Sequence, residues 1–524
     1  MLGMKPNRLL FIAAAALVAS CAQPPAPPFA TLAPPVIDPQ ILPLAERETP
    51  AVLETLRQLT SVDSGTGQAA GLVTVADQVE RFALSLGGEV QRVTPAKGVA
   101  GQIVIATFKG TGRKRVMLMS HLDTVYVAGT AAARPFRVDG NRAIAPGIAD
   151  DKGGVAVFLH AMKLLKARGF TDYERVTMVF NTDEERGSAG SRDTIRSQAG
   201  QHDFVMSGEP SGVEAFVLLS TSGAGGIRAE FKGGDRPVEE AADMVLRTRE
   251  LFTQVPETRM NWTLLRVQDA AAGAGGTPVV WSIKGKGSHA GVAPQLGVNA
   301  VVEASMLVKR VSDAAAAMPG VRIHWRAITG GQVSNIIPDQ ASAVLEVTAP
   351  GDARAAAEAL ARVGSQAQVQ GAEVTAQVGG AVPAVVAGAN FVSADVRVPT
   401  PEAYATLVKS VRERMAAQKF ASSSIAVTDE LGFPPFNATP QSRALADAAI
   451  SIYKQMGATI GVYPRTYGAT DAAWAGRSGK PVIESVGLPG GNYHSSQEEY
   501  ILIDQVPRRV ALVAEMIRAI ARMP

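Results

Sequence analysis

The 524-residue sequence contains a single cysteine, Cys21, few aromatic residues and no run of more than three basic side chains. One cysteine cannot form a disulfide within the chain, so the stability of the fold must come from its core. Because basic runs with interleaved aromatics are absent and the formal net charge is only +3, nucleic acid is not expected as a partner. A composition of 46% hydrophobic and 19% charged residues indicates a globular protein rather than a disordered one.

A hydrophobic run long enough to cross a bilayer is also absent. The apolar segment from Leu9 to Val18 is much shorter than the roughly 20 residues that a membrane-spanning helix needs. It follows Lys5 and Arg8 and precedes small residues, which is typical of a secretory signal peptide. The letters "VASC" ending at Cys21 resemble a bacterial lipobox, whose cleavage leaves a lipidated cysteine at the new N-terminus. We therefore expect an exported protein that is lipid-anchored to a bacterial membrane and faces the periplasm or the exterior.

The order of the sequence patterns predicts a divided main domain. A signal peptide at 1–20 and a Pro-rich linker at 21–44 precede it, the linker being suited to hold a domain away from a membrane. Strand-like apolar runs then alternate with helical patterns, which indicates an α/β fold with a mostly parallel sheet. The main domain is expected at 45–220 and 430–524, separated by a long insertion at 221–429.

Five polar side chains follow predicted strands or lie in loops of the main domain. Ligands gather at the carboxyl ends of the strands in parallel sheets, so these side chains are expected to converge. They are His121, Asp150, Glu184, Glu185 and Glu209.

The adjacent carboxylates Glu184 and Glu185, in "NTDEERGSAG" after the apolar run "RVTMVF", repel each other unless a cation lies nearby. A pair of zinc ions needs a bridging carboxylate and nitrogen ligands. Asp150, between glycines in "GIADDKGG", is placed to bridge, and His121 is placed to ligate while Asp123 holds its ring. Glu185 would then bind metal and Glu184 would take a proton from a metal-bound water. Taken singly, each motif is weak, and acidic residues in such turns are more often turn formers than metal ligands.

Five motifs in order make the metal interpretation specific: "HLDTV", "GIADDKGG", "NTDEERGSAGSRD", "SGEPS" and "GLPGGNYHSSQEEYI". Together they resemble the dinuclear-zinc aminoacylase and carboxypeptidase family, and within it the glutamate carboxypeptidase-like branch. The resemblance implies two Zn²⁺ ions per chain, a site that cobalt and manganese also suit. It implies Asp123 and Glu184 as catalytic residues, with Glu184 the general base. The implied ligands are His121, Asp150 and Glu209 for one ion, and Asp150, Glu185 and His494 for the other.

The same resemblance implies that the insertion is a βαββαβ ferredoxin-like lid. "GKGSHAGVAP" would supply His289 to steady an oxyanion, and "SNIIP" would supply Asn335 to contact substrate. In many members of the family this histidine comes from the lid of a partner subunit. The segment "RTYGATDAAW" resembles the loop that lines the substrate site. Its candidate substrate-binding residues are Arg465, Thr466 and Gly468, since an arginine fork suits a carboxylate.

The insertion is about twice as long as one lid requires, and it contains a repeat. Glu240 and Trp262 are 22 residues apart, as are Glu303 and Trp325. The copies are nested, with an inner copy at about 277–380 that alone carries "SHAG" and "SNIIP". We therefore expect a monomer whose double lid imitates a dimer and delivers the lid histidine within one chain. The alternative is a decorative insertion with dimerisation intact.

Other residues limit the substrate assignment. Where the branch has an arginine before a "PxFN" pattern, this sequence has Phe433 in "GFPPFN", which favours a substrate side chain that is different from glutamate or more apolar. Arg397 either compensates for the missing guanidinium or lies on the surface. The remaining histidines, His160, His202 and His324, are expected to be structural.

These observations predict a metal-dependent hydrolase of a peptide or amide bond next to a free carboxylate, acting on a small peptide as a carboxypeptidase or dipeptidase. Hydrolysis of N-acyl amino acids or other small amides is the alternative with the same machinery. A lipid-anchored binding protein that has lost turnover is the alternative from another class.

Overall fold

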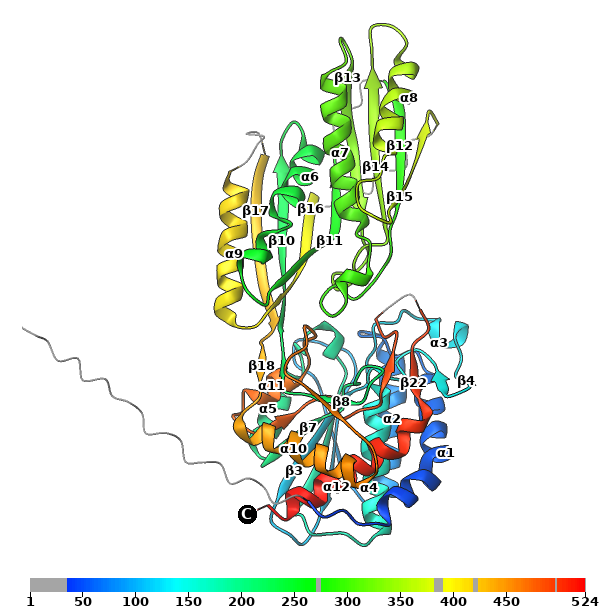
Figure 1. Ribbon diagram of the computed structural model, residues 1–524, viewed down its shortest axis with the longest axis vertical. Helices are drawn as coiled ribbons and strands as arrows, with labels where there is room; N and C mark the ends of the chain where they lie inside the picture. Colours follow the sequence, from blue (N-terminus) through cyan, green and yellow to red (C-terminus); the bar gives the residue numbers. More distant parts are fainter. Residues whose placement is uncertain (1–34, 270–274, 381–389, 418–422, 495–496, 524) are drawn as a thin grey trace, which may run out of the picture. The chain divides into compact units, whose positions relative to one another are not determined.

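The computed structural model describes residues 35–269, 275–380, 390–417, 423–494 and 497–523 (Figure 1). The predicted signal peptide and Cys21 lie outside the described residues. Within the described ranges, every helix is too short or too polar to span a membrane.

The main domain is built on a six-stranded sheet of order β1-β2-β6-β3-β7-β20. Strands β6, β3, β7 and β20 run parallel to their neighbours in that series, and β1 and β2 are antiparallel additions at one edge. The α/β class with a mostly parallel sheet is therefore confirmed. The strands are β1 (Glu89–Val93), β2 (Ile103–Lys109), β3 (Arg115–His121), β6 (Arg175–Asn181), β7 (Phe204–Ser207) and β20 (Val482–Ile483).

Helices cover both faces of this sheet because its strands are apolar on both sides. Along β3, Val116 and Leu118 face one core cluster, whereas Met117 and Met119 face another. The first face is covered by α1 (Ile41–Thr60), α2 (Ala69–Ser85), α4 (Lys152–Ala167), α10 (Pro440–Gln455) and α12 (Val506–Ala521). The second is covered by α5 (Arg192–Gly200) and α11 (Ala472–Gly476).

Short elements complete the main domain and its connections. The helical ones are α3 (Thr130–Ala133), η1 (Glu184–Arg186) and η4 (Ile503–Gln505), whereas the short helices η2 (Leu251–Gln254) and η3 (Pro294–Leu296) lie within the inserted segment 223–433. The strands are β4 (Arg137–Asp139), β5 (Arg142–Ile144), β8 (Phe216–Leu218), β9 (Ser220–Thr221), β18 (Phe436–Asn437), β19 (Gly461–Tyr463), β21 (Gly490–Gly491) and β22 (Tyr500–Leu502).

The first helix of the main domain begins before the predicted linker boundary at residue 44. Helix α1 starts at Ile41, whose side chain is fully buried, and the backbone N–H of Asp38 donates to Glu515 at 2.8 Å. Proline in a first helical turn removes no intrahelical hydrogen bond, so Pro43 does not mark a linker residue. The linker prediction is therefore too long at its C-terminal end.

Between β9 and β18 lies a unit that we call the insert, residues 223–433, built on an eight-stranded sheet of order β15-β12-β14-β13-β11-β16-β10-β17 (Figure 1). Its helices are α6 (Pro237–Thr248), α7 (Ala300–Ala316), α8 (Ala353–Gly364) and α9 (Pro401–Ala416), and they share one continuous core with the sheet. Its strands are β10 (Gly223–Gly233), β11 (Arg259–Gln268), β12 (Thr277–Lys284), β13 (Arg322–Gly330), β14 (Gln340–Thr348), β15 (Glu373–Val378), β16 (Asn390–Val398) and β17 (Ser423–Phe433).

The insert consists of two halves with the same element order. The inner half is β12-α7-β13-β14-α8-β15, and the outer half is β10-α6-β11 followed, after the inner half, by β16-α9-β17. If the four strands of each half are numbered in chain order, both halves have the spatial order 4-1-3-2 in the sheet. β17 continues to Phe433, beyond the boundary predicted at residue 429.

The two halves meet at a seam where β11 pairs antiparallel with β13. The register of β11 against β16 shifts between Trp262 and Leu264, and that of β13 against β14 shifts between Trp325 and Ala327. The same irregularity thus occurs at the same place in both halves. Trp262 of the outer half corresponds to Trp325 of the inner half. The same offset in residue number makes Thr329 the counterpart of Arg266, and these two residues are paired directly across the seam.

A buried ion pair recurs in both halves. Glu240 and Glu303 are fully buried, and they contact Arg247 and Arg310 at 3.5 and 2.8 Å. Each arginine also donates to backbone carbonyls at the end of the second helix of its half, for instance from Arg310 to Gly364 at 2.5 Å. Such a pair fixes one helix against the other, because each buried charge is bonded rather than left unpaired.

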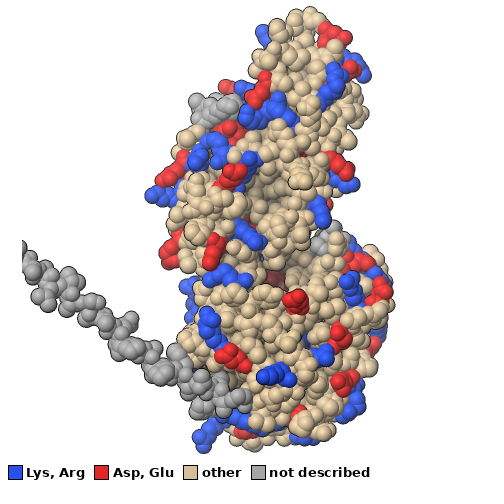
Figure 2. Space-filling view, in the orientation of Figure 1, with Lys and Arg blue, Asp and Glu red and all other residues tan. Residues whose placement is uncertain are grey.

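Positive and negative side chains are interspersed over the displayed face of the molecule (Figure 2). That face carries no large field of one sign, in keeping with the near-neutral net charge of +3.

Candidate metal centre

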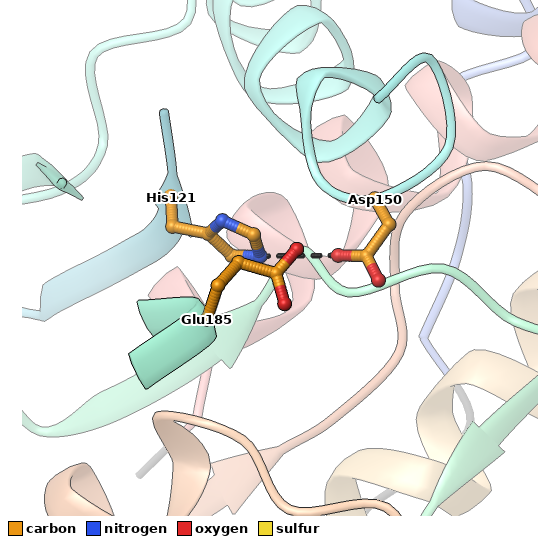
Figure 3. Close-up of side chains that lie close together, drawn as sticks. All are labelled: His121, Asp150 and Glu185. Atoms are coloured by element: carbon orange, nitrogen blue, oxygen red, sulfur yellow. Dashed lines mark hydrogen bonds and ion pairs between the residues drawn. The ribbon is translucent and has the colours of Figure 1, made fainter. Parts of the chain in front are cut away.

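The carboxyl ends of β3, β6 and β7 bring the predicted polar residues to one edge of the main sheet. His121 is the last residue of β3, Glu184 and Glu185 begin η1 shortly after β6, and Glu209 follows β7. Asp150 lies in the loop before α4. Figure 3 shows His121, Asp150 and Glu185 with their side chains directed toward one another.

Distances between the side chains join the predicted ligands into one cluster. His121 Nε2 lies 3.1 Å from Asp150 Oδ1 and 3.6 Å from Glu209 Oε1. His494 Nε2 lies 3.1 Å from Asp150 Oδ2 and 2.9 Å from Glu185 Oε2. The two oxygens of Asp150 therefore face different histidines, which places its carboxylate between two groups of ligands.

Asp123 organises the residues around His121. The carboxylate of Asp123 accepts the backbone N–H groups of Glu184 and Glu185 at 3.1 and 3.2 Å, and the hydroxyl of Thr66 at 2.7 Å. His121 Nδ1 lies 3.0 Å from the carbonyl oxygen of Asp123 and 3.3 Å from its Oδ1. With Nδ1 directed at these acceptors, Nε2 faces the cluster, as a metal-binding imidazole requires.

The loop that carries Asp150 is held by a residue far away in the sequence. Glu499 accepts the backbone N–H groups of Gly147, Ala149 and Asp150 at 2.9, 2.8 and 3.0 Å. It also accepts the hydroxyl of Tyr126 at 2.7 Å. Burial and the nearby Asp150 raise the pKa of Glu499 to about 7.

The donor set fits divalent metal ions. Among the described residues, no Lys or Arg side chain forms an ion pair with Asp150, Glu184, Glu185 or Glu209, although these carboxylates are largely buried. Burial and the neighbouring carboxylates raise the pKa of Glu184 and of Glu209 well above the usual range. Buried carboxylates that repel one another are stabilised by a cation, and carboxylate with imidazole is the ligand set of zinc sites.

Ligand atoms of two overlapping groups lie within 4.8 Å of one another: His121, Asp150 and Glu185, and His121, Asp151 and Glu209. Asp151 is not among the residues predicted from the sequence. Its Oδ1 caps α4 by accepting the N–H of Gly154 at 3.2 Å. An aspartate directly before a helix is an N-cap signal, so the sequence pattern predicts that role better than a role in the cluster.

A second unpredicted carboxylate lies near Glu184. Asp471 is 5% exposed and accepts the hydroxyl of Ser188 at 2.5 Å. Burial raises the pKa of Asp471 to about 7, and its proximity also raises the pKa of Glu184. The "ATDAAW" segment carries this residue, but a single acid before a short helix has no distinctive spacing.

The inner half of the insert places His289 at the cluster. The ring of His289 stacks on the ring of His494, with centroids 5.2 Å apart and planes at 13°. Burial, with His494 and Arg397 nearby, lowers the pKa of His289 well below its usual value. The carbonyl of Asn335 accepts the N–H of Ala290 at 2.8 Å, so the two predicted insert residues lie in neighbouring segments.

The predicted substrate-binding loop lies beside the insert. A side chain at Gly468 would come 3.6 Å from Val292, three residues after His289, and Thr466 accepts the N–H of Gly468 at 3.1 Å. Arg465 belongs to the same loop, but the contacts of its guanidinium are with residues outside the cluster. Its guanidinium contacts Asn437 at 2.8 Å, Glu257 at 3.5 Å and the carbonyl of Thr221 at 3.5 Å.

Arg397 is buried, so the surface alternative for this residue is wrong. It is 6% exposed, and its guanidinium bonds Asp395 at 2.8 and 3.0 Å. Since Arg397 and Asp395 are two residues apart on β16, they project from the same side of the sheet. Phe433 is also buried, and its ring centroid lies 6.1 Å from that of Trp474.

The other histidines lie in structural surroundings. His160, in α4, contacts Thr55 at 2.9 Å and Glu48 at 2.7 Å, both on α1. His202 contacts the carbonyl of Gln198 at 2.6 Å, and His324 lies within β13.

Comparison with known proteins agrees with this arrangement. Residues 117–519 match the model of peptidase family M20/M25/M40. The chain is 37% identical to carboxypeptidase G2 of Pseudomonas sp. (strain RS-16) over 474 residues, 90% of each chain. The fold resembles that of the dipeptidase Dug1p from Saccharomyces cerevisiae, with a TM-score of 0.56, 12% identity and coverage of 93% and 98%. It also resembles human carnosine dipeptidase 1, with a TM-score of 0.55, 10% identity and coverage of 92% and 99%.

The family match covers most of the chain, and the relative is 37% identical to it. Both agree with a cluster whose ligand types suit divalent metals. The chain belongs to peptidase family M20/M25/M40 and is a metallopeptidase.

Proposed function

We propose that the protein hydrolyses a peptide or amide bond next to a free carboxylate, as a carboxypeptidase or dipeptidase, with two divalent metal ions at the cluster. The observation that carries this proposal is the position of the Asp150 carboxylate between His121 and His494, at 3.1 Å from each. The relative named carboxypeptidase G2 supports the reaction class.

His121, Asp150 and Glu209 would hold one ion, and Asp150, Glu185 and His494 the other. Zinc is the metal we propose, and cobalt or manganese suits the same ligands. Divalent cations at such a site polarise a scissile carbonyl and acidify a water molecule.

Glu184 is the proposed general base. Its carboxylate is 4.0 Å from His121 Nε2, farther than the carboxylates of Asp150 and Glu209, while its backbone N–H is fixed by Asp123. A side chain beside the ligands that is not needed as a ligand is free to receive the proton of the attacking water and pass it to the leaving amine.

His289 is the proposed donor to the oxyanion. Its Nδ1 accepts the backbone N–H groups of Gly291 and Val292, so the proton of the neutral ring is on Nε2. A neutral N–H donor held in place stabilises negative charge that develops on the carbonyl oxygen. Asn335 would contact the substrate beside it.

The buried guanidinium of Arg397 is a candidate for binding the substrate carboxylate, together with Arg465, Thr466 and the backbone at Gly468. Charge-assisted pairs of arginine and carboxylate are geometrically specific. Phe433 packs against Trp474 where the family branch has an arginine, so we propose a substrate side chain that is different from glutamate or more apolar.

The inner half of the insert acts in this proposal as a second lid that supplies His289 within the same chain, and the protein is a monomer. The seam supports this proposal, because β13 already occupies the edge of β11 on which another chain could pair. A tight dimer by analytical ultracentrifugation, with activity restored on mixing His289→Ala and Glu184→Ala variants, would refute it.

Export and lipidation at Cys21 remain part of the proposal. They rest on the signal-like residues and on "VASC". A Cys21→Ser variant should leave the membrane fraction for the soluble one, while the unsubstituted chain should stay with the membrane.

The test of the function is amine release from dipeptides, glutamyl conjugates and N-acyl amino acids, before and after chelation and zinc restoration. We expect metal-dependent turnover of one substrate class and its loss in Glu184→Gln, with the metal content retained. Glu174→Gln, at an exposed glutamate, is the matched control. Turnover of N-acyl amino acids alone would establish the alternative hydrolase. Two bound ions without turnover of any compound would favour a binding protein.

A further inference from the structure

The segment that carries His289 is a tight loop whose backbone faces its own ring. His289 Nδ1 accepts the N–H of Gly291 at 3.0 Å and the N–H of Val292 at 3.1 Å. These two bonds select the tautomer that leaves the proton on Nε2. Any change in the loop therefore changes both the position of the ring and the nitrogen that can donate.

A residue of the outer half of the insert forms hydrogen bonds with the same loop. Arg259, the first residue of β11, donates from Nη1 to the carbonyl oxygens of Gly291 at 2.5 Å and Val292 at 3.1 Å. The peptide group between Gly291 and Val292 thus accepts from Arg259 at its oxygen and donates to His289 at its N–H. Hydrogen bonds in such a chain polarise and strengthen one another.

Arg259 is itself fixed against the main domain. The centre of its guanidinium lies 3.6 Å from the ring centroid of Tyr467, which is within the range of a cation–π contact. Tyr467 belongs to the loop that also contains Thr466 and Gly468. A single side chain of the outer half therefore contacts both the histidine loop of the inner half and the substrate loop of the main domain.

The loop is packed closely at this place. A Cβ atom on Gly291 would lie 2.8 Å from Arg397 Nε and 2.9 Å from the carbonyl oxygen of Tyr467, so no side chain fits there. Asn261, two residues after Arg259, adds a bond to the carbonyl of Ala290 at 2.9 Å. The close approach at Gly291 and the hydrogen bond from Asn261 show that the loop packs tightly against β11.

The duplicated half supplies a comparison. The counterpart of Arg259 is Arg322, the first residue of β13, and Arg322 is exposed. The two halves thus share an arginine at this position, but only the outer copy bonds a histidine loop and stacks on the main domain.

We propose that Arg259 is a positioning residue. Through its contacts with the loop after His289 and with Tyr467 of the main domain, it sets the tautomer and the position of the His289 ring. The inference rests on the proposed role of His289 at the oxyanion. Arg259 touches neither the cluster nor the reacting atoms, and it acts through the peptide group between Gly291 and Val292.

The test compares Arg259→Ala, Arg259→Lys, Asn261→Ala and the control Arg322→Ala in the full chain. We expect kcat to fall about 10- to 100-fold in Arg259→Ala, because a reacting group displaced by about 1 Å costs this much. KM and metal content should change little. Arg259→Lys should recover only part of the loss, since one ammonium replaces a planar fork. Arg322→Ala should behave as the unsubstituted chain.

Two further measurements separate positioning from general destabilisation. In His289→Ala, adding Arg259→Ala should lower kcat no further, because both variants remove the same contribution. ¹⁵N NMR of histidine-labelled protein should show one ring of the six histidines losing its Nε2-protonated tautomer in Arg259→Ala. The Asn261→Ala variant should show the same shift to a smaller degree, and it provides this measurement if Arg259→Ala does not fold.

Full additivity in the double variant, or an unchanged tautomer, would overturn the inference. If His289→Ala retains full kcat, the proposed role of His289 is wrong. The tautomer measurement then still decides whether Arg259 positions the ring, so the two failures are distinguishable.

Discussion

Replacing Glu499 with glutamine tests whether the metal centre depends on a residue that binds no metal. Glu499 accepts three backbone N–H groups from the loop 147–150 and the hydroxyl of Tyr126. In Glu499→Gln one carboxylate oxygen becomes an NH₂ group. That group opposes the N–H of Gly147 or those of Ala149 and Asp150, whichever way the amide is turned.

The expected loss follows from these bonds. Hydrogen bonds to a charged acceptor contribute about 1.5 to 3 kcal/mol each, and an opposed donor adds a penalty of about 1 to 3 kcal/mol. Because the loop can relax, we expect a net loss of about 3 kcal/mol, which corresponds to about 100-fold in metal affinity at 1.4 kcal/mol per tenfold. This is at the upper end of effects measured for residues that orient metal ligands.

The assay is competition for zinc with a chromophoric chelator, combined with kcat/KM at saturating zinc. Glu498→Gln is the matched control, because Glu498 is next in the chain but pairs with Arg137 at the surface, with about half of each side chain exposed. Equal zinc affinities for Glu499→Gln and Glu498→Gln would refute the reasoning. It would mean that the Asp150 loop is held by its own backbone rather than by Glu499.

Two other substitutions test the core and the pocket. Burial lowers the pKa of His160 in the folded chain, whereas in the unfolded chain this pKa is near 6.5. As the pH is lowered below 6.5, the unfolded chain therefore binds a proton at His160 more readily than the folded chain, and the stability of the fold decreases. His160→Gln should therefore show a shallower decline of Tm between pH 6.5 and 5, and an unchanged slope would contradict the pKa shift. Phe433→Arg should raise kcat/KM for glutamate-terminated substrates relative to apolar ones about 10-fold, from a contact of about 1.5 kcal/mol. Unchanged selectivity would show that Phe433 does not line the pocket.

Much of the cluster could be predicted because its residues follow strands of a parallel sheet. His121 ends β3, and Glu184 and Glu209 follow β6 and β7 within three residues, and strand ends of such sheets meet at one edge. The α/β class was predictable for the same reason, since alternating apolar runs and helical patterns specify it.

The supporting contacts could not be predicted because they join distant parts of the chain. Glu499 reaches a loop 349 or more residues earlier, and Arg259 reaches a loop 32 residues later in a different half of the insert. No spacing rule relates such pairs. The burial of Arg397 was equally hidden, because an arginine in a strand is compatible with either side of the sheet until the neighbouring loop is placed.

The seam between β11 and β13 frees this protein from a constraint that symmetric assemblies obey. In a symmetric pair of identical chains, the residue at the twofold axis faces its own copy, so Arg266 at this place would face a second Arg266, and like charges directly opposite one another destabilise a sheet. Here its partner is Thr329, and Arg266 donates instead to the carbonyls of Leu265 and Gly330 at 2.7 and 2.5 Å. Joining both halves in one polypeptide makes the interface non-palindromic, so each side can mutate without an obligatory change on the other.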